Sequence, residues 1–169
     1  MKEVPDIDVS RTCCFTGHRP EKLNESHEVI RTNLRKEILK ALSLGYDTFL
    51  TGMAAGTDTW AADIVIELKR KRPDIRLICA IPFKGVEKNR TCELQAKFSE
   101  ILAASDGAVY MSHKYKRWVF LARDEWMVEH SSYVIAVYNG SPGGTEFTVD
   151  LAKRTGRQVA FVELERVGE

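Results

Sequence analysis

The sequence lacks any apolar run close to the roughly 20 residues that a membrane-spanning helix needs. Its N-terminus, Met1 to Asp6, is polar and acidic and has no signal-peptide core. It also lacks an excess of either charge, because 25 Lys and Arg oppose 24 Asp and Glu. A dedicated duplex-DNA binder needs a strongly basic face, so this balance argues against one but allows a local basic patch. We expect a cytoplasmic protein without membrane association.

Cysteine is scarce and is not arranged for metal binding. The four cysteines, at positions 13, 14, 79 and 92, form no CxxC or Cys/His pattern of the kind that binds zinc. Cys13 and Cys14 are adjacent in a predicted strand, so their side chains should point to opposite faces and cannot easily bridge. We predict reduced, mostly buried thiols and no metal site.

The chain also lacks linkers and low-complexity segments. Its 169 residues fit one domain over 1–169, which allows burial of roughly 70% of the unfolded chain's surface. The 44% hydrophobic and 29% charged content is that of an ordinary globular protein.

Apolar runs and helical patterns alternate along the chain. Strands are predicted at about 12–15, 48–51, 76–81, 107–111, 133–138 and 158–162, with Pro82 ending the third. Ser26 and Gly45 are the predicted caps of the first of five intervening helices. Continuous apolar strands are typical of a sheet covered on both faces. We therefore predict an α/β fold: a three-layer α/β/α, Rossmann-like, doubly wound sheet of about six mostly parallel strands. In that fold ligands bind beyond the carboxyl ends of the strands at the switch point, usually near strands 1 and 4.

The loop after the second strand is the most informative segment, reading Leu-Thr-Gly-Met-Ala-Ala-Gly-Thr-Asp over 50–58. Its glycines, Gly52 and Gly56, match neither the P-loop nor the dinucleotide fingerprint. Asp58 either caps the following helix or holds a ligand hydroxyl. Since an acid beside a phosphate is repulsive, a ribose hydroxyl or a base is its better partner.

A second loop follows the first strand and reads Thr-Gly-His-Arg-Pro over 16–20. Thr16 offers a hydroxyl, Gly17 allows close backbone approach, and Arg19 can pair bidentately with a phosphate. The alternative is a tight turn with a solvated arginine. His18 has no identifiable Ser, Cys or carboxylate partner, so we count it as a ligand contact rather than a catalytic group.

A third loop, with Gly143, Gly144 and Thr145, opens the last helix. Successive glycine N–H groups at a helix N-terminus, with a Thr hydroxyl, form a phosphate site, unless the segment is only a glycine-rich turn. Arg123, early in the fourth helix, either reaches this cleft or forms a surface ion pair. The loops together predict a site for a nucleotide or another phosphate-bearing small molecule.

With these motifs placed, the chain resembles the YpsA-like branch of the SLOG superfamily, which also contains DprA/Smf and LOG proteins. The resemblance rests on residues 14–23, 51–62 and 143–145 and on Ala-Ile-Pro-Phe at 80–83, which adds Pro82 to the candidates. It implies a Rossmann-like fold and a site for nucleotide-related ligands.

The LOG enzymes hydrolyse cytokinin riboside monophosphates, and their motifs match this chain in part. Arg123 and the shortened loop at 142–145 match, but the catalytic Glu falls on Thr148 and a Lys falls on Asp124. Glycosidic cleavage passes through an oxocarbenium-like state that needs a carboxylate. Glu146 and Asp150 are turned away from that position by the helix. The resemblance therefore supports phosphate binding more strongly than hydrolysis.

Our leading hypothesis is a cytoplasmic SLOG-type protein that binds a nucleotide or a nucleotide-derived metabolite such as an ADP-ribose-like ligand. The sequence assigns no cofactor and is compatible with a homo-oligomer. One alternative is an N-glycosidic hydrolase of nucleoside monophosphates, with Glu146, Asp150 or Asp58 replacing the missing Glu. Another is a DprA-like single-strand nucleic-acid binder using the basic and aromatic segment 114–118. The predicted ligand contacts are Thr16, Gly17, His18, Arg19, Gly52, Gly56, Asp58, Pro82, Arg123, Gly143, Gly144 and Thr145.

Overall fold

The computed structural model describes residues 4 and 6–164, and within them six strands form one parallel sheet in the order β4-β3-β2-β1-β5-β6. The strands are β1 (Thr12–Gly17), β2 (Thr48–Thr51), β3 (Arg76–Phe83), β4 (Gly107–Ser112), β5 (Tyr133–Val137) and β6 (Gln158–Phe161). The helices are α1 (His27–Ser43), α2 (Thr57–Lys71), α3 (Cys92–Ala104), α4 (Val119–Glu129) and α5 (Gly144–Arg154). Single 3-10 turns occur at η1 (Val9–Arg11), η2 (Pro20–Lys22) and η3 (Val86–Asn89).

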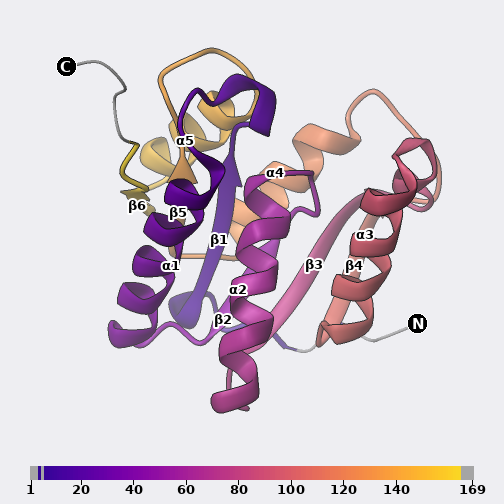
Figure 1. The fold of residues 1–169 in the computed structure, drawn as a ribbon. Coiled ribbons are helices and arrows are strands. Elements are labelled where there is room, and N and C mark those ends of the chain that lie inside the picture. Colours follow the sequence, from indigo (N-terminus) through magenta and orange to yellow (C-terminus); the bar gives the residue numbers. More distant parts are fainter. Residues whose placement is uncertain (1–3, 5, 165–169) are drawn as a thin grey trace.

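The helices cover both faces of the sheet, which confirms the three-layer prediction. Helices α1, α2 and α3 pack on one face, and α4 and α5 pack on the other (Figure 1). Cys13 lies in the core under the first set and Cys14 in the core under the second, as expected for neighbouring strand residues. Cys13, Cys14 and Cys79 are buried, and Cys92 is exposed. Within the described residues, no helix combines the length and apolarity that crossing a membrane requires.

Strand β1 is the centre of the sheet, because the chain extends the sheet from it in two directions. Cys13 pairs with Phe49 of β2 on one side and with Tyr133 of β5 on the other. Strands β2, β3 and β4 are added outward in order before the chain returns across the other face to form β5. The switch point therefore lies between β1 and β5, rather than near strands 1 and 4, because β4 extends the sheet at its far edge.

The predicted element boundaries agree closely with the structure, and β2 coincides with its prediction. Ser26 occupies the N-cap of α1, although its side chain makes no capping hydrogen bond. Gly45 follows α1 with a φ of 100°, the left-handed conformation that glycine supplies after a helix. These residues show that the local helix signals were interpreted correctly.

The prediction that Pro82 ends the third strand is wrong, because β3 continues to Phe83. Strand β2 has already ended at Thr51, which pairs with Cys79, so Pro82 has no partner in β2. On the other side, the pairing with β4 runs to Ile81, passes over Pro82 and resumes where Phe83 pairs with Ser112. Proline therefore interrupts the ladder at one residue without ending the strand.

The end of β1 is in direct contact with the start of α2. A Cβ atom placed on Gly17 would lie 2.2 Å from Oγ1 of Thr57. The Thr57 hydroxyl also donates to the carbonyl of His18 at 3.3 Å. Glycine is therefore required at position 17 for space, and the contact fixes the N-terminus of α2 beside the carboxyl end of β1.

This contact predicts the effect of a single methyl group. Gly17→Ala should lower the free energy of unfolding by about 1–3 kcal/mol, because the added methyl overpacks a buried junction. Gly144→Ala is the matched control, since its Cβ would meet only Asp124 Oδ2 at 3.9 Å. Urea denaturation of both variants measures the difference. Equal stability of the two variants would contradict the proposed packing.

Candidate functional site

A cavity of about 300 Å³ opens at the carboxyl edge of the sheet beside the β1–β5 switch point. Its walls come from the end of β1, the loop after β2, the segment after β3, and the first turns of α4 and α5. The lining residues are Phe15, Thr16, Gly17, His18, Arg19, Lys22, Ala54, Asp58, Arg90, Phe120, Leu121, Arg123, Asp124, Met127, Gly144 and Thr145. Segments far apart in the sequence therefore converge on one space.

Most of the predicted contacts lie on this cavity. Eight of the twelve line it: Thr16, Gly17, His18, Arg19, Asp58, Arg123, Gly144 and Thr145. The other four, Gly52, Gly56, Pro82 and Gly143, do not line it. The predicted loops thus meet at one place, but only part of each loop faces the cavity.

Three of the four remaining residues are glycines that pack against residues of the cavity wall or next to it. Gly52 has no room for a side chain, since a Cβ there would lie 2.8 Å from Asp58 Oδ2. Gly56 has a φ of 94° and packs against Pro20, 2.7 Å from where its own Cβ would be. Gly143 has a φ of 141° and its Cβ position lies 3.2 Å from Lys22 Nζ. Pro82 is buried within β3.

Two arginines from distant elements hold the loop after β2. Arg123 of α4 donates through Nη1 to the carbonyl of Gly52 at 3.0 Å. Arg90, just before α3, donates through Nη1 to the next carbonyl, that of Met53, at 2.8 Å. Met53 is fully buried with a φ of 63°, a left-handed conformation that costs a non-glycine residue about 1–2 kcal/mol. The two guanidinium groups stabilise this strained loop.

Asp58 lies at the base of the same loop, in the first turn of α2. Its Oδ2 accepts a hydrogen bond from the N–H of Ala54 at 3.2 Å, and the N-cap position belongs to Gly56, so Asp58 does not cap the helix. Burial raises the pKa of Asp58 to about 6, although the charge of Arg123 and the Ala54 N–H act in the opposite direction. A carboxyl group that titrates near neutrality inside a cavity is available for proton transfer.

Asp124 is a second carboxylate on the cavity, and the sequence analysis did not count it as a site residue. Its Oδ1 is 3.1 Å from Nε of Arg123. Burial raises the pKa of Asp124, with Arg123 and the hydroxyl of Thr148 partly offsetting the effect. Thr148, which stands where the LOG enzymes have their catalytic glutamate, thus lies against Asp124 of the neighbouring helix α4. Thr148 itself donates to the carbonyl of Gly144 at 3.0 Å.

His18 is buried at the end of β1 and contacts the loop after β5. Its Nε2 is 3.3 Å from the hydroxyl oxygen of Ser141, and its ring packs on Tyr138 with centroids 5.5 Å apart. Burial lowers the pKa of His18, and the positive charge of Lys22 lowers it further. The imidazole in this position links the loops after β1 and β5.

The N-terminus of α5 meets the cavity at Gly144 and Thr145. Gly143 is the N-cap and offers no side chain, so the first N–H groups of the helix are available to a ligand. Lys22 reaches across from η2 and donates to the carbonyl of Pro142 at 3.2 Å. The helix dipole and the lysine together make this end of the cavity attractive to an anion.

Sequence reasoning missed Arg90 and Lys22, although both carry charge into the cavity. Lys22 lies within segment 14–23, and only its position soon after the first strand could have indicated that it belongs to the site. Arg90 follows β3 at the same edge, before the Thr91 N-cap of α3, and belongs to no motif. With Arg19 and Arg123 they give four cations against the two carboxylates of the lining. Among residues 4 and 6–164, no group of three or more His, Cys, Asp or Glu is placed to hold a metal.

Comparison with known proteins identifies the family. The model of the YpsA family, described as the YspA SLOG family, matches residues 13–164. The chain belongs to this family. Among curated relatives, the uncharacterized SPbeta prophage-derived protein YoqJ of Bacillus subtilis (strain 168) is 33% identical over 119 residues, which cover 63% of this chain and 70% of YoqJ.

Solved structures share the SLOG fold at low sequence identity. DNA processing protein A (DprA) of Streptococcus pneumoniae aligns with a TM-score of 0.59 and 14% identity over 94% of this chain. This chain spans about half of that protein, 52% of its length. DNA processing protein A of Helicobacter pylori, whose structure describes single-stranded DNA binding, aligns with a TM-score of 0.60 and 19% identity, covering 95% of this chain and 68% of the other. These similarities establish the fold.

The burial of Asp58 predicts a pH-dependent stability. Its folded pKa of about 6 exceeds the unfolded value of about 3.9, so the protonated carboxyl stabilises the fold below about pH 4. That contribution, about 3 kcal/mol, is lost as the pH rises through 6. Asp58→Asn keeps an acceptor for the Ala54 N–H without the charge. Relative to the native protein, it should gain stability between pH 4 and pH 7, as measured by urea denaturation.

The matched control is Asp74→Asn, which removes a carboxylate from an exposed turn beside Arg72. Its difference from the native protein should stay small at every pH. If the difference in the free energy of unfolding between Asp58→Asn and the native protein is constant from pH 4 to pH 7, the pKa of Asp58 is not raised by burial.

Proposed function

We propose that this SLOG protein binds a mononucleotide or a related phosphate-bearing metabolite in the cavity at the switch point, as a cytoplasmic protein. The observation that carries the proposal is the convergence of four cationic side chains and the N-terminus of α5 on one concave site. Such a site at the carboxyl edge of a doubly wound sheet is where ligands of this fold class bind. The free, buried thiols of Cys13 and Cys14 are consistent with a reducing compartment.

The phosphate group is assigned to the α5 end of the cavity. Gly144 and Thr145 present backbone N–H groups there, and Lys22 supplies a mobile positive charge beside them. Gly144 and Thr145 carry no carboxylate, but Asp124 Oδ2 lies 3.9 Å from the Cβ position of Gly144, so binding of an anion at this end depends on the positive charge of Lys22. Gly143 contributes as the N-cap that exposes the N–H groups rather than as a lining residue.

The nucleoside is assigned to the space between Asp58 and the start of α4. Asp58 can accept a hydrogen bond from a ribose hydroxyl, while Phe120 and Leu121 give an apolar surface for a base. The volume of about 300 Å³ is at the lower end of small-molecule sites, which favours a mononucleotide over a larger ADP-ribose-like ligand.

Calorimetric titration with nucleoside 5′-monophosphates tests the proposal. The native protein should bind at least one of them saturably, and Lys22→Met should weaken binding about tenfold because a charged hydrogen bond is lost. Lys40→Met is the matched control, since Lys40 lies in the last turn of α1, away from the cavity. Failure of the native protein to bind any nucleotide or other phosphate ester would refute the function.

The same samples report on N-glycosidic hydrolysis. Glu146 and Asp150, two of the three expected substitutes for the missing glutamate, do not line the cavity and instead lie toward Tyr138, whose pKa they raise in addition to the effect of burial. Asp58 and Asp124 do line it. Release of free base by the native protein but not by Asp58→Asn would show that the cavity is an active site that requires Asp58.

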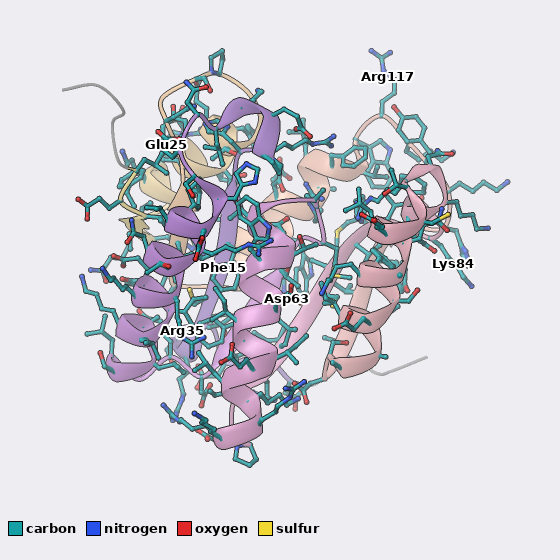
Figure 2. All side chains as sticks on the ribbon, in the orientation of Figure 1. Phe15, Glu25, Arg35, Asp63, Lys84 and Arg117 are labelled. Carbon is teal, nitrogen blue, oxygen red and sulfur yellow. The ribbon has the colours of Figure 1, made fainter. Side chains whose placement is uncertain are left out.

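A second candidate function is binding of single-stranded nucleic acid, favoured by the loop between β4 and α4. Tyr115 and Trp118 are 61% and 52% exposed, unusually high for such large rings. Figure 2 shows Arg117 extending from this loop away from the protein. Tyr115 also packs edge-on against Phe83, with centroids 5.7 Å apart. Exposed rings among basic residues suit stacked bases and a phosphate backbone. The similarity to the Helicobacter pylori DNA-binding protein is consistent with this candidate.

Oligonucleotide binding distinguishes this candidate from the first. A variant with Lys116, Arg117 and Trp118 replaced by alanine should lose affinity for single-stranded DNA at least tenfold, since each stacked base contributes about 1–3 kcal/mol. Binding to the native protein should also weaken steeply with salt. A double alanine variant at Arg70 and Lys71, at the far end of α2, is the charge-matched control, since both variants remove two positive charges. Unchanged affinity in the first variant would exclude the loop.

A further inference from the structure

Three guanidinium groups gather on the wall of the cavity opposite α5. Arg19, Arg90 and Arg123 all line the cavity, from the loops after β1 and β3 and from α4. Burial lowers the pKa of Arg90, and the positive charges of Arg19 and Arg123 lower it further, so the three groups lie within electrostatic range of one another. Like charges brought together in a half-buried place repel unless an anion joins them.

The carboxylates near these arginines offset only part of their positive charge. Arg123 pairs with Asp124 at 3.1 Å, whereas neither Arg19 nor Arg90 forms an ion pair within 4.0 Å with any residue that the structure describes. Asp58 and Glu87 act on Arg90 at longer range, and the lining as a whole has four cations against two carboxylates. Positive charge therefore remains available on this wall.

The arginines are held in place before any ligand arrives. Arg90 uses Nη1 for the Met53 carbonyl and lies 5.7 Å from the ring of Phe98. Arg123 uses Nη1 for the Gly52 carbonyl and lies 5.6 Å from the ring of Phe120. Each has further N–H groups, since a guanidinium carries five donors. Fixing two of the three side chains in this way lowers the entropy lost on binding.

This wall is separate from the phosphate site at α5. The Met53 carbonyl that holds Arg90 follows β2, and α5 follows β5, with β1 between the two strands. Two strand spacings place these anchor points about 10 Å apart across the sheet. Lys22 belongs to the α5 end, where its Nζ contacts the Pro142 carbonyl. Two adjacent phosphates joined by one oxygen are too close together to occupy both ends.

We propose that the cavity takes a mononucleotide-sized ligand with anionic groups at both ends, one at the N-terminus of α5 with Lys22 and a second held by Arg19, Arg90 and Arg123. This inference rests on the proposed function and names the class of ligand within it. A nucleoside with phosphates on both its 3′ and 5′ oxygens suits two separate anion sites, because the ribose holds the phosphates apart. Asp58 then faces the ribose between the two anions.

Calorimetry with three ligands of the same nucleoside tests the second subsite: the 5′-monophosphate, the 5′-diphosphate and the 3′,5′-bisphosphate. The bisphosphate should bind the native protein at least tenfold more tightly than the monophosphate, and the diphosphate should gain little. Arg90→Met should abolish the gain, so that it weakens binding of the bisphosphate at least tenfold more than binding of the monophosphate. Lys22→Met should weaken monophosphate and bisphosphate by a similar factor.

Arg19→Met controls for damage to the loop after β2, because Arg19 is exposed and holds neither carbonyl of that loop. It too should reduce the gain for the bisphosphate. Equal affinity of the native protein for monophosphate and bisphosphate, or an equal loss for both ligands in Arg90→Met and Arg19→Met, would overturn the second subsite.

Sulfate separates this inference from the proposed function. If no nucleotide binds, the proposed function fails, but sulfate should still raise the melting temperature of the native protein. Part of that increase should be lost in Arg19→Met, and a different part in Lys22→Met, with additive effects in the double variant. A sulfate response that Arg19→Met leaves unchanged would overturn the arginine subsite as well.

Discussion

The parallel pairing of β1 with both β2 and β5 is the constraint on which the rest of the structure depends. Strand β1 is the first strand of the chain and lies inside the sheet, and β2, β3 and β4 are added on one side of it. The chain must then cross to the other face to form β5. The helices that follow β1 and β5, α1 and α5, consequently pack on opposite faces of the sheet, and the cavity opens at the edge beside the two strands (Figure 1). The cavity is a product of this topology, and its chemistry depends on which side chains reach it.

Those side chains are fixed by hydrogen bonds between segments that are distant in the sequence. Arg90 and Arg123 each satisfy a carbonyl in the loop after β2, which would otherwise be left unpaired beside a buried, left-handed Met53. The same bonds direct positive charge at the cavity. Stability uses the Nη1 atom of each arginine. In the proposed site, ligand binding would use their remaining N–H groups, so a substitution at either position would change both properties.

The sequence was sufficient for the fold because its strands are continuous apolar runs and its helices carry clear boundary signals, such as Ser26 and Gly45. It failed at Pro82, since the cost of a missing N–H depends on a neighbouring strand whose end the local sequence does not encode. It identified Arg19 and Asp58 from their place after strands, but not Arg90, which reaches the cavity only through tertiary contacts. Gly52 and Gly56 were recognised as special, yet they support neighbouring side chains instead of lining the cavity.

The contact between Gly17 and Thr57 has a consequence for motion. With no space for even a methyl group, the end of β1 and the start of α2 must move together, so this wall of the cavity is rigid. The opposite side is built differently: Phe120 and Leu121 at the start of α4 are exposed, and the segment at 139–144 is mostly exposed as well. Any widening that admits a ligand therefore falls to α4 and to the loop before α5, which would close against a fixed surface.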